Sequence, residues 1–299
     1  MLKITHKLHL MARQLPYKYL LLGFLALAVL CGAIRALHPS AQSTDTSTPF
    51  PVTHYRMADV QGGIASYPPR SGDSPPVVRG GVVSHHLLAE RYIARYFQNL
   101  SGHAYRQVVL IGPNHANAGV SDVITSTRRD WDTPYGVVHV ARVLPELPQG
   151  DAVMAGDHAL EVLMPYIKVY LPQASVIPIL IKSSVTENEL NSLVVKLSGL
   201  VGSDTLVLVS SDFSHYLSEE DAFAHDTIAL SAIERRDYAF LAPVRADYLD
   251  SPGSVIVMLK LMDEIGANKL QVFAHASAAT IANTPGAPTT TYYFLNVYE

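Results

Sequence analysis

The chain has 299 residues, of which 48% are hydrophobic, and its formal net charge at pH 7 is -4. This length and composition allow a large core in one or two domains and exclude a wholly disordered protein, while the absence of a basic run in the globular part argues against nucleic acid as a partner. The single cysteine, Cys31, permits neither an intramolecular disulfide nor a thiolate cage, so any metal must be held by nitrogen and oxygen ligands.

The N-terminal segment has the pattern of a signal anchor. Lysine and arginine are scattered through residues 1–18, and residues 19–36 are mostly apolar. The basic flank favours the cytoplasm for the N-terminus and the opposite side of the membrane for the rest of the chain. We therefore expect a cytoplasmic segment at 1–18, a transmembrane helix at 19–36, and a single-pass protein whose C-terminal domain is extracytoplasmic. A cleavable signal peptide is the alternative, because the apolar run is short for a membrane span.

A stretch rich in proline, serine and threonine follows at residues 37–76. Such a composition cannot bury enough apolar surface to offset the entropy lost on ordering, so we expect a tether with few contacts to the domain. The folded domain is predicted to span residues 77–299.

Within 77–299, segments with the period of a strand alternate with segments that have the period of a helix. This alternation predicts a single layered α/β domain with a mostly parallel central sheet flanked by helices. Helices are expected at 87–97, 157–171, 186–201, 218–236 and 254–265, with Pro165 kinking or restarting the second of them. Strands are expected at 176–181, 206–209, 270–273 and 291–298 in addition to those described next.

Three predicted strands are each followed closely by histidine. His85 follows the strand that contains Gly80 and Gly81, His115 follows the run Val108–Ile111, and His215 comes shortly after the strand 206–209. The carboxyl ends of parallel strands meet at one edge of a sheet, and histidine is both the commonest metal ligand and a proton carrier near neutral pH. The pattern indicates a functional site at that edge, although any one histidine in such a position could instead have a structural role.

Five short motifs follow one another along the predicted domain. They are Ser84-His85, Gly112-Pro113-Asn114-His115, Thr133-Pro134-Tyr135-Gly136, Asp157-His158-Ala159-Leu160-Glu161 and Ser210-Ser211-Asp212-Phe213-Ser214-His215. Their order and spacing resemble those of the Memo-like family, which is named AmmeMemoRadiSam system protein B in bacteria and archaea. The resemblance covers about residues 77–299.

This resemblance implies a fold similar to that of the class III extradiol ring-cleaving dioxygenases, in which two histidines and a carboxylate hold a non-haem Fe(II). Carried over by motif, His85 and His115 are the expected metal ligands and His215 the expected acid/base residue. The third ligand is a cysteine in the animal member of the family and a glutamate in the dioxygenases. Asp250 falls at the position of that cysteine, and it would complete a two-histidine, one-carboxylate set. Such a set suits Fe(II), which we favour, and it also accepts copper or zinc.

Two of these residues have alternative interpretations. Asp250 precedes Ser251-Pro252 at the start of a predicted helix and could be its N-cap. His158 is expected to act at the catalytic site with His215. Together with Glu161, one helical turn away, it could orient the site or line the pocket, or it could be a helix-start residue whose role is only local.

Two function classes remain open from the sequence. One is a metal-dependent oxidoreductase that acts on a small molecule, with His215 moving a proton. The other is a non-catalytic module that binds a metal or a protein partner on a dioxygenase-like scaffold, since fold is a poor guide to reaction.

Overall fold

The computed structural model describes residues 48–54, 56–70, 76–119 and 123–299. The predicted anchor at 19–36 lies outside these residues. Within them no helix is long and apolar enough to cross a membrane. The longest described helix has 16 residues and begins with three acidic side chains, whereas a membrane span needs about 20 mostly apolar residues. The localisation predicted from the sequence, membrane-anchored with an extracytoplasmic domain, is therefore corrected: the described structure offers no span to support it.

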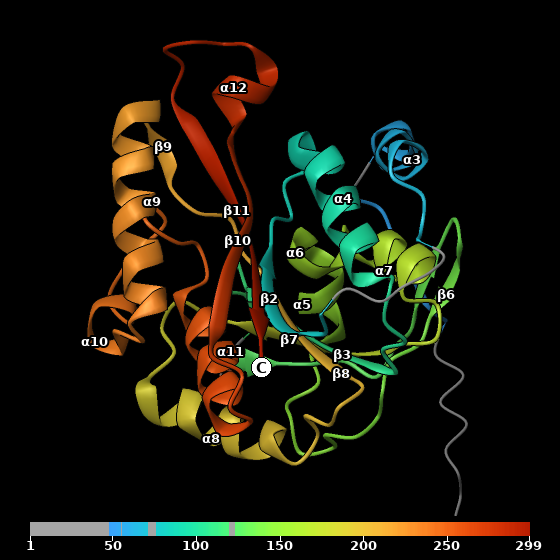
Figure 1. The fold of residues 1–299 in the computed structure, drawn as a ribbon. Coiled ribbons are helices and arrows are strands. Elements are labelled where there is room, and N and C mark those ends of the chain that lie inside the picture. Colours follow the sequence, from blue (N-terminus) through green and yellow to red (C-terminus); the bar gives the residue numbers. More distant parts are fainter. Residues whose placement is uncertain (1–47, 55, 71–75, 120–122) are drawn as a thin grey trace, which may run out of the picture. The chain divides into compact units, whose positions relative to one another are not determined.

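Residues Thr48–Glu299 form one compact unit built around an eight-stranded sheet (Figure 1). The strand order is β10-β11-β2-β8-β3-β7-β4, and β9 pairs with β11 beside this path. The strands are β2 (Val78–Val83), β3 (Gln107–Pro113), β4 (Ile124–Thr125), β7 (Ser175–Ile181), β8 (Thr205–Ser210), β9 (His215–Leu217), β10 (Lys269–Ser277) and β11 (Thr289–Tyr298).

The sheet is parallel only at its centre. β2, β8, β3 and β7 pair in parallel, whereas β10, β11 and β9 on one side and β4 on the other pair antiparallel. The expected mostly parallel sheet is therefore a mixed sheet. The difference arises because β10 and β11 are joined at one end by residues 278–288, which include α12 (Ala278–Ala282), and β11 then runs back antiparallel along β10.

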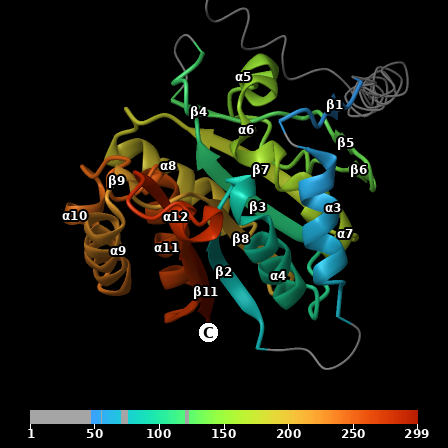
Figure 2. The same ribbon diagram turned by 90° about the horizontal axis from the view of Figure 1, so that it is seen from above.

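Helices cover both faces of the sheet (Figure 2). α4 and α7 pack on one face, and α8 and α11 pack on the other, so the strands alternate side chains between two cores: Val108 and Leu110 belong to one, Val109 and Ile111 to the other. The helices are α4 (Glu90–Leu100), α5 (Asp151–Gly156), α6 (His158–Glu161), α7 (Met164–Tyr170), α8 (Glu187–Ser198), α9 (Glu219–Glu234), α10 (Tyr238–Leu241), α11 (Pro252–Glu264) and α12 (Ala278–Ala282), with a 3-10 turn, η1, at Leu87–Ala89.

Local sequence signals explain where several helices begin. Thr186 caps α8 through a capping box with Glu189, which satisfies two backbone N–H groups at the helix start. Pro165 lies in the first turn of α7, so the predicted helix 157–171 is divided into α6 and α7. This restart leaves α6 as a short separate helix whose first residue is His158.

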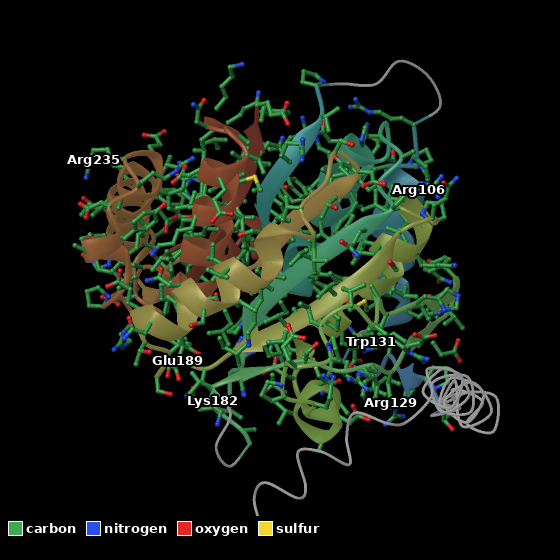
Figure 3. All side chains as sticks on the ribbon, turned by 90° about the horizontal axis from the view of Figure 1, so that it is seen from below. Arg106, Arg129, Trp131, Lys182, Glu189 and Arg235 are labelled. Carbon is green, nitrogen blue, oxygen red and sulfur yellow. The ribbon has the colours of Figure 1, made fainter. Side chains whose placement is uncertain are left out.

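Ordered elements begin earlier than the expected start of the domain near Val77. β1 (Phe50–Pro51) pairs with β5 (Trp131–Thr133), which in turn pairs with β6 (Gly136–Val138), and α3 (Met57–Ser66) packs against α4. The Phe50 and Trp131 rings lie 5.2 Å apart, and both side chains are buried. Figure 3 labels Trp131 at this side of the molecule, far from Arg235 on the opposite side. Apolar contacts with distant residues thus order part of the segment whose composition suggested a tether.

Candidate metal centre

The ends of the central strands bring ionisable side chains together at one edge of the sheet. Ser84 and His85 directly follow β2, His115 lies two residues after β3, and Asp212 lies two residues after β8. Asp250 comes from the loop before α11. Because β2, β8 and β3 are neighbouring parallel strands, their carboxyl ends deliver these groups to the same place.

Burial and a hydrogen bond to Ser210 fix the orientation of the His85 ring. Its imidazole is buried, and its Nδ1 lies 3.0 Å from the hydroxyl oxygen of Ser210. Ser210 donates its own proton to the carbonyl of Ala159 at 2.6 Å, so its oxygen accepts from His85. Nδ1 of His85 therefore carries the hydrogen, and the lone pair of a neutral His85 is on Nε2.

His115 is held in the same tautomer by a carboxylate. Its Nδ1 donates to Asp157 Oδ1 at 2.9 Å, and its backbone N–H donates to Asp157 Oδ2 at 2.7 Å. Asp157 also caps α6 by accepting from the backbone N–H of Ala159. A carboxylate that orients a histidine in this way is the usual support of a metal-binding imidazole, and it leaves Nε2 of His115 free to bind.

Both free Nε2 atoms lie near one carboxylate oxygen. Asp250 Oδ2 is 3.3 Å from His85 Nε2 and 3.9 Å from His115 Nε2. The atom is buried and makes no hydrogen bond of acceptable geometry to any described residue, whereas Asp250 Oδ1 accepts from Ser211 at 2.6 Å. If both histidines are neutral, their Nε2 atoms and Asp250 Oδ2 are all hydrogen-bond acceptors. Acceptors that face one another in a buried site are unfavourable unless a proton or a cation lies between them.

The N-cap alternative for Asp250 does not describe its environment. Ser251 occupies the N-cap position of α11, and no side-chain capping hydrogen bond is present there. Asp250 instead places its carboxylate between Ser211 and the two histidines.

The pKa shifts reflect the same concentration of charge. Burial alone would lower the pKa of His85, but the carboxylates of Asp212 and Asp250 outweigh it and raise the pKa to about 9. Burial also acts to raise the pKa of Asp250, but the charge of His85, the hydrogen bond from Ser211 and the nearby His215 lower it. When no metal is bound, the raised pKa therefore favours a proton on His85, and this positive charge offsets the nearby carboxylates as a metal cation would.

His158 completes a second group of nitrogen donors. Its ring stacks on His115 with centroids 4.4 Å apart and meets His85 edge-on at 5.3 Å. Burial, together with the positive charges of His85 and His115, lowers the pKa of His158 to about 4, so it is neutral at pH 7. Among the described residues, two overlapping sets have ligand atoms within 4.8 Å of one another: His85, His115 and His158, and His85, Asp212 and Asp250. Asp250 Oδ2 also lies near His115 Nε2, so a ligand set can draw on both.

His215 lies on β9 at the border of this cluster. Its Nδ1 donates to the carbonyl of Phe213 at 2.6 Å and lies 3.2 Å from the carbonyl of Ala246. These acceptors fix the hydrogen on Nδ1 and leave Nε2 as an acceptor. Ser214, the residue before His215, donates from its backbone N–H and its hydroxyl to Asp226, which also accepts from Thr291.

Two residues of the site, Asp212 and His54, were not assigned a role from the sequence, and a third, Glu161, has contacts other than those expected. Asp212 accepts from Ser84 at 2.6 Å and lies 3.8 Å from His85 Nε2, whereas the sequence indicated it only as part of a motif. Glu161, expected to orient the site with His158, instead accepts from the backbone and Nδ1 of His54, at 2.7 and 2.8 Å respectively. His54 was placed in the tether, yet its ring lies 6.3 Å from that of His158. No sequence signal near His54 indicates this contact, which joins residues over a hundred positions apart.

Comparison with known proteins identifies the family of the domain that carries these residues. The family model described as "Memo-like protein" matches residues 82–286, more than half of the chain. The chain belongs to the Memo-like family. The match contains the candidate ligands His85, His115 and Asp250 as well as His158 and His215.

Archaeal and bacterial members are similar to much of the chain. A MEMO1 family protein of Pyrobaculum aerophilum is 26% identical over 215 residues, 67% of this chain and 76% of that protein. The corresponding protein of Pyrobaculum arsenaticum is 29% identical over 218 residues, with the same shares covered. One from Aquifex aeolicus is 32% identical over 139 residues, 43% of this chain and 51% of that protein. The similarity to Memo-like proteins thus covers the domain that carries the cluster.

Proposed function

We propose that this protein binds one divalent metal through His85 Nε2, His115 Nε2 and the Asp250 carboxylate. The observation that carries the proposal is Asp250 Oδ2, a buried oxygen that has no hydrogen-bond partner among the described residues and lies close to both Nε2 atoms. A cation there would satisfy all three groups at once. Two histidines and one carboxylate suit Fe(II), the favoured metal, while copper and zinc accept the same donors.

We further propose that the metal-loaded protein is a non-haem oxidoreductase of the dioxygenase type. A metal in such a site supplies Lewis acidity and open positions for oxygen-containing ligands. The chain supplies the rest: Ser210 and Asp157 fix the two imidazoles, and His215 can accept a proton at Nε2 because its Nδ1–H is held by the Phe213 carbonyl. Neutral His158, stacked on His115, can accept a hydrogen bond from a bound small molecule.

The test is oxygen uptake by the Fe(II)-loaded protein with a panel of catechols, both unsubstituted and carrying a single carboxylate. His215→Ala should keep its metal, because this residue is outside the proposed ligand set, and should lose oxygen uptake by about a hundredfold or more, the usual contribution of a proton-transferring side chain. His225→Ala is the matched control, since His225 contacts the carbonyl of Asp247 rather than the cluster.

Uptake in His215→Ala at the rate of the unaltered protein would contradict the assigned role. A metal-loaded protein that consumes no oxygen with any catechol would instead favour the non-catalytic metal-binding function.

A further inference from the structure

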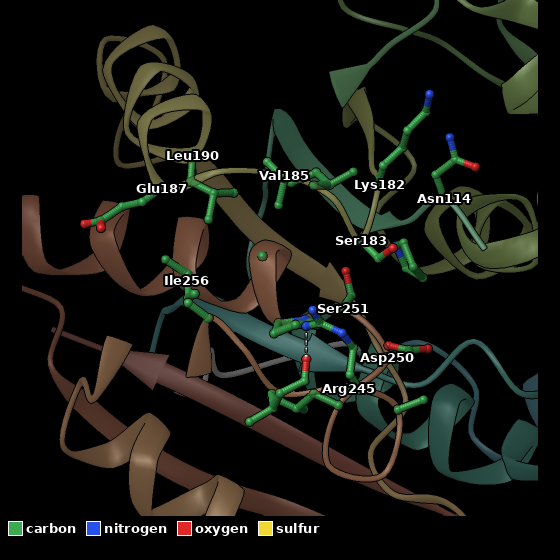
Figure 4. Close-up of a pocket in the computed structure, with 18 of the residues that line it drawn as sticks. Asn114, Lys182, Ser183, Val185, Glu187, Leu190, Arg245, Asp250, Ser251 and Ile256 are labelled. Atoms are coloured by element: carbon green, nitrogen blue, oxygen red, sulfur yellow. Dashed lines mark hydrogen bonds between the residues drawn. The ribbon is translucent and has the colours of Figure 1, made fainter. Parts of the chain in front are cut away.

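A cavity of about 530 Å³ opens beside the candidate metal centre. Asp250 and His115 belong to its lining at one end, and residues from the start of α8 and from α11 line the other end. Figure 4 shows Asp250 and Ser251 on one side of this space and Leu190 and Ile256 on the other. A cavity of this size holds a small organic molecule.

Most of the wall is apolar. Leu190, Leu249 and Ile256 are buried members of the core between the sheet and the helices α8 and α11, and Val185 and Tyr238 pack against that core. These side chains offer no charged group to a ligand along the wall that they form. They would stabilise a ligand body of rings or methylene groups through burial of apolar surface.

Three cationic residues line the cavity, Lys182, Arg245 and Lys260, and Arg245 lies where the apolar wall meets the metal-site end. Arg245 is exposed, and it donates through one guanidinium nitrogen to the carbonyls of Pro243 and Val244, at 2.8 and 2.9 Å. Among the described residues its hydrogen bonds go to these carbonyls and not to a carboxylate. In Figure 4 its side chain lies between Asp250 and Ile256. By contrast, Lys260 at the far end contacts Asn191 and Glu187, and Lys182 donates to the carbonyl of Gly119 at 2.6 Å. Arg245 is therefore free to bind an anion that enters the cavity.

We propose that this cavity binds apolar monocarboxylates, with the carboxylate paired to Arg245 and the apolar body against Val185, Leu190 and Ile256. A monoanion fits better than a dianion because the carboxylates of Glu187 and Asp250, which also line the cavity, would repel a second negative charge. Guanidinium and carboxylate match in a planar, two-point geometry. The inference rests on the proposed function in one respect: it assigns the substrate class of the same site.

The experiment is calorimetric titration of the full chain, freed of metal by chelation and dialysis, with three ligands of similar shape. The ligands are 4-phenylbutyrate, 4-phenylbutanol and 4-phenylbutylamine. The carboxylate should bind, the alcohol should bind about tenfold more weakly, and the amine should give no measurable binding. Arg245→Gln should weaken the carboxylate about tenfold or more and leave the alcohol unchanged.

Two further variants sharpen the result. Arg142→Gln removes the same charge from an exposed arginine outside the cavity lining and should change nothing. Ile256→Trp should abolish binding of both the carboxylate and the alcohol by filling the apolar end. Equal binding of the three ligands, no binding of any, or an Arg245→Gln variant that binds the carboxylate normally would overturn the proposal. Because the protein is metal-free here, a failure of the metal site would be seen separately in metal content and would leave this result intact.

Discussion

Asp250→Asn should lower the affinity for a divalent metal by at least about a hundredfold while the domain stays folded. Asparagine keeps the shape of the side chain and an oxygen that can accept from Ser211, so the local hydrogen bond survives. It loses the negative charge that faces the two histidines, and loss of a directly bound carboxylate should cost more than the ten- to hundredfold typical of supporting residues. Metal competition with a chromophoric chelator measures the affinity, and thermal unfolding reports the fold.

Asp247→Asn is the control for this substitution, because Asp247 is in the same loop but its side chain is about half exposed, at 48%. It should bind metal as the unaltered protein does. Unchanged affinity in Asp250→Asn would remove the carboxylate from the ligand set and leave the three histidines His85, His115 and His158 as the alternative donors.

Gly81→Ala should destabilise the domain by about 3 kcal/mol, at the upper end of the usual cost of overpacking a core. A methyl group at this position would lie 2.0 Å from the hydroxyl of Tyr96 and 2.7 Å from the carbonyl of Leu295. Those two groups are joined by a hydrogen bond of 2.8 Å in the buried core, which the methyl group would break. Urea unfolding measures the change in the free energy of unfolding.

The matched control is Gly156→Ala at the end of α5, where an added methyl group meets nothing within 4 Å. Its free energy of unfolding should change by less than about 1 kcal/mol. Similar stabilities for the two variants would show that β2, the strand that leads to His85, tolerates more bulk than this packing implies. The glycine pair before the histidines is thus explained by close packing rather than by a phosphate-binding loop.

The features that could be predicted from the sequence are those that short, local patterns determine. Apolar runs that end in small and polar residues marked β2, β3 and β8, and their shared parallel direction is enough to bring His85 and His115 to one edge. The resemblance to the family pointed to Asp250, which is far from both histidines in the sequence. Capping and proline signals marked the start of α8 and the break before α7.

What could not be predicted depends on contacts between distant residues. The support of His115 by Asp157 joins positions 42 apart, and the contact of His54 with Glu161 joins positions 107 apart. α3 is short and contains two adjacent glycines, so its local propensity is weak, and packing against α4 orders it. The antiparallel pairing of β10 with β11 likewise could not be predicted from a local pattern in either strand.

The most direct test of the metal centre is elemental analysis of the anaerobically purified full chain beside the double variant His85→Ala/His115→Ala. We predict about one divalent metal per unaltered chain and almost none in the double variant, because two of the three proposed ligands are gone while Ser210 and Asp157 remain to support the fold. The same metal content in both proteins would contradict the proposed centre.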